Sequence, residues 1–166
     1  FPENSRGEPL PEDDTVARDF ELMRRAGANS IRVYYVPSRH FLDIAARHGI
    51  RVMIGIPWPE HLCFLDQWEV KEDIKKTVRE AVSSLAGHPA VLAWLIGNEI
   101  PSHIVRWHGA AKVEKFLAGL AAIVREADPK ALVTYANYPS TEYLRLPFLD
   151  FLSFNVYLHD EKAFRS

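Results

Sequence analysis

The order in which apolar runs and amphipathic segments follow one another limits most strongly how this chain can fold. From about residue 12 onward the two kinds of segment alternate. The apolar runs are rich in β-branched and aromatic residues, which is typical of strands. Several are almost continuously apolar, as expected for parallel strands covered by helices. The sequence therefore predicts an α/β fold with five parallel strands, in "SIRVYYV", "IRVMIGIPW", "AVLAWLIGNE", "ALVTYANY" and "FLDFLSFNVY".

The segments between these runs have apolar residues at helical spacing. We expect the carboxylates of Asp13 and Asp14 to cap the first helix, and Gly27 and Gly49 to end the first two helices. Four helices are expected, beginning near Asp13, Pro37, Val70 and Ala110.

Residues 1–166 are expected to form one domain or part of one. Hydrophobic residues make up 48% of the chain and charged residues 25%, the balance of a globular protein with a sizeable core. No low-complexity linker marks a domain boundary. An open doubly wound sheet and a (β/α)8 barrel would both produce this strand pattern.

Polar and aromatic side chains gather where the predicted strands end. The carboxyl ends of all strands in a (β/α)8 barrel converge on one mouth, where active sites are built, whereas an open sheet uses one or two strand ends. Glycine fingerprints for nucleotides are absent. The barrel is therefore favoured, with these strand-end residues as site candidates: Trp58, His61, Asn98, Glu99, Asn137, Tyr138, Asn155 and Tyr157.

Composition argues against several other partners and ligands. The formal net charge is −2 with both signs mixed along the chain, so no basic stripe indicates nucleic acid. No apolar run is long enough for a membrane span, and the first residues do not resemble a signal peptide. The lone Cys63 is compatible with the cytoplasm and equally with a cell-envelope or secreted protein. Because His103 and His108 are five residues apart and no Cys or Asp completes a ligand set, we expect no metal or cofactor.

Four stretches carry a resemblance to a known family: "IRVYYVP", "GIPWPEH", "GHPAVLAWLIGNEIP" and "LDFLSFNVY". In order and spacing they resemble the second, third, fourth and sixth strand regions of the (β/α)8 catalytic domains of retaining glycoside hydrolases. They look most like the barrel of family 2 β-glycosidases and relatives in the same clan. The resemblance implies a partial TIM barrel comprising about strands 2 to 6, and hydrolysis of O-glycosidic bonds in a carbohydrate substrate.

The resemblance also implies residue roles. Glu99, of the Asn-Glu pair that ends the fourth barrel strand, would be the acid/base, and Asn98 would bind the sugar 2-hydroxyl. Arg32 would support the carboxylate of the nucleophile, which Tyr157 would touch with Asn155 beside it. Aromatic faces for sugar stacking are expected from Trp58, Trp107 and Tyr138, and the substrate-binding set also includes His61 and Asn137.

Structural roles compete with these at several positions. Glu99 could equally be a capping or salt-bridging acid, and Arg32 could form a structural ion pair with it or with another acid. Trp107 is as compatible with packing as with sugar stacking, and Trp94 and Phe154 are expected in the core.

The expected nucleophile, a Glu at the end of the seventh strand, has no counterpart in the sequence. Glu142 and Glu161 lie in connections rather than after apolar strands. We therefore expect residues 1–166 to be the middle of a catalytic domain that is inactive by itself. A partial barrel would leave strand edges and apolar surface open, so self-association is also expected.

Two other function classes stay open. One is a non-catalytic carbohydrate-binding or scaffolding barrel of a larger envelope protein. The other is a (β/α)8 aldolase or metal-dependent hydrolase. The aldolase is disfavoured because the lysines fall in expected helices and connections rather than at strand ends.

Overall fold

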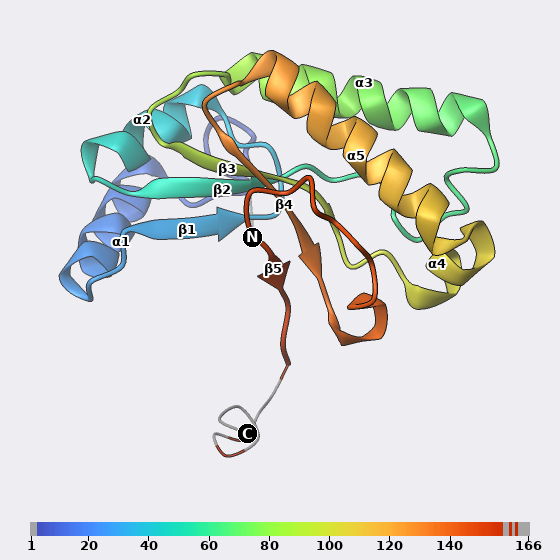
Figure 1. Ribbon diagram of the computed structural model, residues 1–166. Coiled ribbons are helices and arrows are strands. Elements are labelled where there is room, and N and C mark those ends of the chain that lie inside the picture. The colour runs from blue at the N-terminus through green and yellow to red at the C-terminus, as the bar shows by residue number, and fades with distance from the viewer. Residues whose placement is uncertain (1–2, 158–159, 161, 163–166) are drawn as a thin grey trace.

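The computed structural model describes residues 3–157, 160 and 162. Its centre is one five-stranded sheet in which every neighbouring pair is parallel and the strand order follows the chain (Figure 1). A doubly wound sheet reverses its strand order at a switch point, whereas a barrel does not. The predicted partial TIM barrel is thus confirmed, with strands β1 (Ser30–Val33), β2 (Arg51–Gly55), β3 (Val91–Asn98), β4 (Leu132–Asn137) and β5 (Ser153–Phe154).

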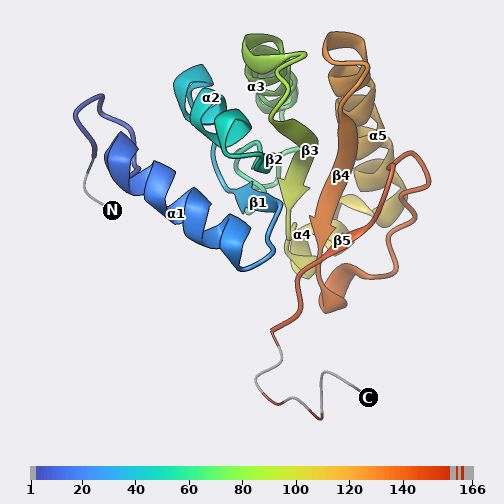
Figure 2. The same cartoon turned by 90° about the vertical axis from the view of Figure 1, so that its left-hand side faces the viewer.

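Helices cover one face of the sheet, and the strands curl away from them (Figure 2). The four expected helices are present, and a seven-residue helix that the sequence pattern did not indicate follows β3. That helix is too short to show an apolar periodicity of its own. The bounds are α1 (Asp13–Arg25), α2 (Arg39–Arg47), α3 (Trp68–Leu85), α4 (Ser102–His108) and α5 (Ala110–Ala127), with a 3₁₀ turn, η1, at Pro139–Thr141.

The hydrophobic core lies between the helices and the convex face of the sheet. Along β2, Val52 and Ile54 are fully buried, while the residues between and around them are exposed or half-buried. Successive strand residues point to opposite faces, so this alternation shows one face covered and the other open. Facing residues from the helices complete the core, including Leu42, Ile44, Ile74, Val78, Leu117 and Leu120.

The C-terminal ends of α1 and α2 lie where the sequence predicts them, but the N-terminal cap of α1 does not have the predicted form. Gly27 and Gly49 have φ of 88° and 67°, the left-handed conformation that favours glycine after a helix. Ser38 caps α2 by accepting a hydrogen bond from the Phe41 N–H at 3.2 Å. The expectation that Asp13 and Asp14 cap α1 is wrong, because both lie inside its first turn and the cap position is Glu12, which makes no side-chain cap bond.

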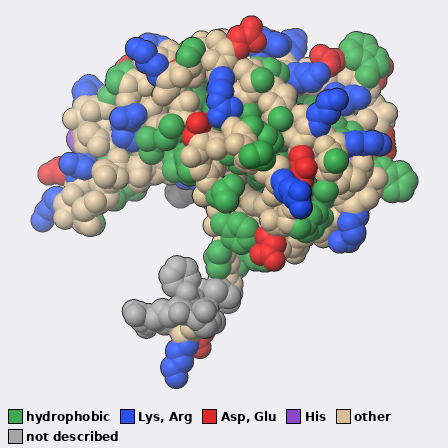
Figure 3. Space-filling model, viewed as in Figure 1, with side chains coloured by type: hydrophobic (Ala, Val, Ile, Leu, Met, Phe, Trp, Pro, Cys, Tyr) green, Lys and Arg blue, Asp and Glu red, His purple; other side chains and the backbone are tan. Residues whose placement is uncertain are grey.

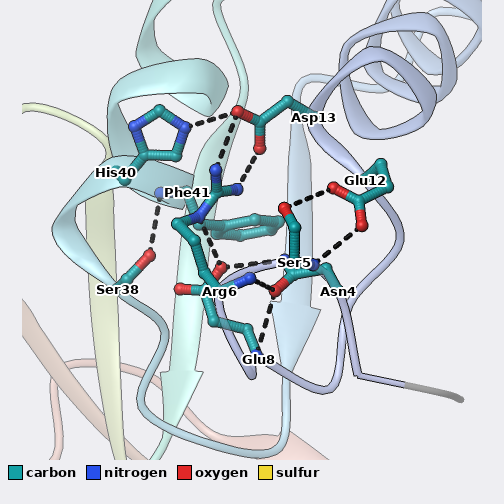
Figure 4. Close-up of polar contacts among 9 residues, drawn as sticks. All are labelled: Asn4, Ser5, Arg6, Glu8, Glu12, Asp13, Ser38, His40 and Phe41. Atoms are coloured by element: carbon teal, nitrogen blue, oxygen red, sulfur yellow. Dashed lines mark hydrogen bonds and ion pairs between the residues drawn. The ribbon is translucent and has the colours of Figure 1, made fainter.

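Asp13 instead joins the segment before α1 to α2 (Figure 4). Its carboxylate accepts hydrogen bonds from Arg6 and pairs with His40 at 2.8 Å. Hydrogen bonding to Arg6, and then to His40, lowers the pKa of Asp13 to about 2. Glu12 also binds the N-terminal segment, since its carboxylate accepts hydrogen bonds from the N–H and the hydroxyl of Ser5. Both acids therefore hold the N-terminal segment in place.

Strand β5 is shorter than its apolar run suggested. Only Ser153 and Phe154 pair with β4. The expectation that Phe154 lies in the core is wrong, since it is 44% exposed, whereas Trp94 is fully buried as expected. Within the described residues β5 has a strand on one side only, so its apolar side chains lack a second neighbour. Hydrophobic side chains accordingly gather on the surface near the point where β5 leaves the sheet (Figure 3).

The buried indole of Trp94 is fixed by an equally buried acid. Its Nε1–H donates to Asp128 Oδ2 at 3.2 Å, and Asp128 is 3% exposed. Trp107 makes a similar bond to Asp66 at 2.8 Å, but on the surface. The two pairs share the same chemistry and differ in burial.

We predict that Trp94→Phe lowers the free energy of unfolding by at least about 1–3 kcal/mol, because it leaves a buried carboxylate oxygen without its donor. Trp107→Phe, the matched control, should change it by about 0.5 kcal/mol or less. Urea unfolding of the two variants measures both values. Equal losses would contradict this account of the buried pair.

Candidate active site

The guanidinium of Arg32 ties together the carboxyl ends of three strands. Its Nη2–H donates to Asn98 Oδ1 at 2.7 Å, and its Nη1–H donates to Asn155 Oδ1 at 2.9 Å. Arg32 lies in β1, Asn98 ends β3, and Asn155 follows β5 directly. These strands are not neighbours in the sheet, so the contacts cross the concave face. Among the described residues Arg32 forms no ion pair, so its partners are amides rather than the acid considered above.

Glu99 is held by donors that come from the segment around and after β5. The Asn155 amide donates to Glu99 Oε1 at 2.6 Å and to Asn98 Oδ1 at 3.0 Å. The Tyr157 hydroxyl donates to the same Glu99 oxygen at 2.6 Å. This hydrogen bond raises the pKa of Tyr157. One carboxylate oxygen therefore receives two donors, which fixes the orientation of the group.

The backbone of Glu99 has an unusual conformation. Its φ is 51°, and among the described residues no other non-glycine residue has a positive φ. Such a conformation costs about 1–3 kcal/mol, persists only where the surroundings enforce it, and is found frequently at active sites. The Glu99 N–H donates to Ala136 O of β4 at 2.9 Å, which is one of the contacts that enforce it.

A cavity of about 170 Å³ adjoins this cluster on the concave face. Arg32 and Asn98 line it together with two residues that the sequence did not single out, Tyr34 and Glu60. The Tyr34 ring centroid lies 4.4 Å from Arg32 Cζ, a cation–π arrangement. Both residues lie within stretches quoted above, but only the three-dimensional arrangement shows that they face the cavity.

Glu60 brings a second carboxylate to the site. Its Oε1 accepts a hydrogen bond from the Asn98 backbone N–H at 3.2 Å. The side chain is half-buried, and this burial raises the pKa of Glu60 to about 7. The group can therefore change its charge near neutral pH.

The structure places Trp58 in the core beneath the site. Only 7% of the residue is exposed, and its ring packs against Phe64 and Phe116 at centroid distances of 5.0 and 6.1 Å. Its indole N–H donates to Ile96 O at 2.8 Å. Trp58 thus supports the end of β3 instead of presenting an open face.

Asn137 is also buried, and its amide serves a local turn. The amide exchanges hydrogen bonds with the Thr141 hydroxyl and carbonyl and accepts from the Tyr138 N–H. The Tyr138 hydroxyl in turn accepts from the Ser102 N–H at 3.1 Å, which links β4 to α4. Of the remaining candidates, Trp107 is 69% exposed on α4, and His61 is exposed in the turn after β2.

The arrangement can carry acid–base chemistry. It consists of a carboxyl group with fixed orientation, amides beside it that can bind hydroxyls, and a cavity bordered by an arginine. The part of the chain that the structure describes contains no group of three His, Cys, Asp or Glu residues suited to a metal ion. None of the helices described is long and apolar enough to cross a membrane.

An arc of sequential parallel strands with such side chains at their carboxyl ends defines part of a TIM barrel with a site at its mouth. Residues 3–163 match the model of the TIM barrel domain of glycosyl hydrolases family 2. The chain therefore belongs to this family, as the resemblance in the sequence predicted.

Curated relatives are named β-glucuronidases. The protein from Pongo abelii is 27% identical over 151 residues, which cover 86% of this chain and 21% of the relative. The protein from Bacteroides fragilis is 29% identical over 125 residues, covering 72% of this chain and 17% of the relative. The chain thus spans about a fifth of the length of the curated relatives it matches.

Solved structures agree in fold. The β-glucuronidase from Ruminococcus gnavus in complex with D-glucuronic acid superposes with a TM-score of 0.74 at 20% identity, covering 93% of this chain and 26% of that chain. The Bacteroides uniformis β-glucuronidase gives 0.70 at 20% identity, covering 94% of this chain and 20% of that chain. These similarities support the barrel architecture.

Close packing around Gly97 gives a test of how rigidly the end of β3 is held. A Cβ at this position would lie 3.0 Å from Trp58 Cζ2 and 3.2 Å from the Tyr135 ring. We predict that Gly97→Ala destabilises the fold by about 1–3 kcal/mol in thermal or urea unfolding, because two buried rings would have to move. Gly119→Ala, in the middle of α5 with open space around the new methyl group, should stabilise it by about 0.5–1 kcal/mol. A neutral Gly97→Ala would show that this end of β3 is loosely packed.

Proposed function

We propose that this chain is part of a catalytic barrel that hydrolyses O-glycosidic bonds by a retaining two-carboxylate mechanism, with Glu99 as the acid/base. The observation that carries the proposal is the position of Glu99: it follows the end of β3 directly and is oriented by Asn155 and Tyr157. Membership of the family 2 TIM barrel domain supports the same chemistry.

In this mechanism Glu99 transfers its proton to the glycosidic oxygen as the bond to the anomeric carbon breaks. A second carboxylate, about 5 Å away, attacks that carbon and forms a covalent glycosyl intermediate. Glu99, now ionised, takes a proton from water, and the resulting hydroxide displaces the second carboxylate. The sugar keeps its anomeric configuration, and Glu99 regains its proton.

The neighbours of Glu99 have roles that fit this sequence of steps. The Asn98 amide would bind the sugar 2-hydroxyl, a contact that strengthens as charge develops at the anomeric centre. Arg32 borders the cavity beside Asn98, where its guanidinium would support the nucleophile's carboxylate. Tyr157, already bonded to Glu99, would lie between the two carboxylates.

We place the nucleophile outside residues 1–166. Glu142 follows η1 and is exposed there, and Glu161 lies outside the described residues. The purified chain should then show no turnover of aryl β-glycosides. Clear turnover would refute the placement of the nucleophile.

The relatives suggest which substrate to test first. Because the curated relatives are β-glucuronidases, an aryl β-glucuronide should be tested first and neutral aryl β-glycosides after it. A non-catalytic carbohydrate-binding barrel is the alternative, and it predicts binding of these sugars without cleavage in any form of the protein.

The role of Glu99 is tested in a polypeptide that joins this domain to the strands completing the barrel. Glu99→Gln should lower kcat/KM by about 10²–10⁴-fold for glycosides with a poor leaving group, since no acid remains to protonate it. The loss should be smaller for 4-nitrophenyl glycosides, whose leaving group needs little protonation. Glu142→Gln is the matched control and should keep wild-type rates. Full activity of Glu99→Gln would exclude the proposed role.

We also propose that the chain associates with itself. Apolar side chains around β5 are exposed, namely Leu152 at 76%, Phe154 and Val156 at 44% each and Tyr157 at 69%. Surface of this kind favours association. Size-exclusion chromatography with light scattering should show a mass that grows with concentration, and Leu152→Lys should reduce that growth. A monomer at all concentrations would contradict this proposal.

A further inference from the structure

Strand β3 extends beyond the strand that precedes it. β2 ends at Gly55, which pairs with Leu95, whereas β3 continues to Asn98. The last part of β3, from Ile96 to Asn98, therefore has no β2 backbone beside it. Buried backbone N–H and C=O groups are nearly always paired, so other groups must bind there.

Side chains from the loop after β2 take the place of the missing strand. The Trp58 indole donates to Ile96 O at 2.8 Å, and the Glu60 carboxylate accepts from the Asn98 N–H at 3.2 Å. The Glu60 N–H donates to Trp58 O at 2.9 Å, which fixes the two residues relative to each other. The loop thus supplies one donor and one acceptor to the edge of β3.

The opposite edge of β3 is held by β4. The Glu99 N–H donates to Ala136 O of β4 at 2.9 Å, whereas the preceding N–H, that of Asn98, donates to Glu60 on the other side. Two successive peptide groups are therefore held from two sides. The left-handed backbone of Glu99, with φ of 51°, lies at this point. A strained residue of this kind persists because its surroundings determine it.

We propose that Glu60 is a positioning residue of the site. By accepting the Asn98 N–H, its carboxylate fixes the peptide group between Gly97 and Asn98, directly before the two residues whose side chains form the site. The catalytic meaning of this contact rests on the proposed acid/base role of Glu99. The contact itself does not depend on that role, so the two can be tested separately.

The surroundings of Glu60 make this contact sensitive to pH. Burial raises the pKa of Glu60 to about 7, and an ionised carboxylate is a stronger acceptor than a protonated one. The titratable and charged groups around it are Arg32 on β1, Tyr34 after β1, Tyr135 on β4 and His61 next in the chain. Burial and the charge of Glu60 also raise the pKa of Tyr135, which stays protonated at neutral pH. The hold on Asn98 should therefore tighten as pH rises through about 7.

Amide NMR of the ¹⁵N-labelled chain tests the proposal without any need for glycosidase activity. In the wild type, the Asn98 amide shift should titrate with a midpoint of about 7, the pKa of Glu60. Glu60→Gln should abolish this titration, whereas Glu69→Gln, in the exposed first turn of α3, should leave it unchanged. A flat Asn98 profile in the wild type, or an unchanged titration in Glu60→Gln, would overturn the proposal.

Hydrogen exchange gives a second measure. At a pH above the titration, exchange of the Asn98 amide should be roughly tenfold faster in Glu60→Gln than in Glu69→Gln, because a bond to a charged acceptor is weakened. Equal rates would count against Glu60 as the acceptor. If Glu60→Gln fails to fold, the Asn98 titration is repeated in His61→Gln, where it should persist if Glu60 causes it; loss of the titration there would overturn the proposal. Should Glu99 prove not to be catalytic, these amide measurements would still show whether Glu60 holds Asn98.

Discussion

The two hydrogen bonds of the Arg32 guanidinium connect the carboxyl ends of β1, β3 and β5, where the site lies. A buried guanidinium is costly unless its N–H groups find partners, and its rigid planar fork can reach two acceptors at once. Here the acceptors are the amide oxygens of Asn98 and Asn155, from strands that do not touch β1. Because both amide oxygens accept from Arg32, the NH₂ group of Asn155 is turned toward Asn98 and Glu99. The orientation of Glu99 thus depends on an arginine at the far side of the sheet.

Those features that depend on neighbours in sequence could be predicted from the sequence. Apolar periodicity is local, so the five strands and the four longer helices were predictable, and α5 begins at Ala110, where its pattern begins. Convergence of the strand ends follows from parallel topology, and this is why Asn98, Glu99, Asn155 and Tyr157 could be expected to lie together. Arg32 lies within its strand, and the family resemblance was what indicated its place in the site.

Features that depend on contacts across the fold could not be predicted. Trp58 ends an apolar run as a sugar-stacking residue would, yet the space between Phe64 and Phe116 accommodates its ring. Glu60 looks like an ordinary loop acid, and its role arises only because β2 ends three residues before β3 does. The apolar run around Phe154 predicts a core position, but β5 has only one neighbouring strand among the described residues, and the side chain stays exposed. For Trp58 and Glu60, partners that decide their roles, Phe116 and Asn98, lie far away along the chain.

The central claim, that Arg32 assembles the site by binding two strand ends at once, is tested most directly by a double-mutant cycle. Arg32→Leu, Asn155→Ala and the double variant are compared with the wild type by urea unfolding of the chain. If the two groups act as one unit, their coupling energy should be about 0.5–3 kcal/mol. Losses that add within about 0.3–0.5 kcal/mol would show that Arg32 and Asn155 contribute independently, which would contradict the account.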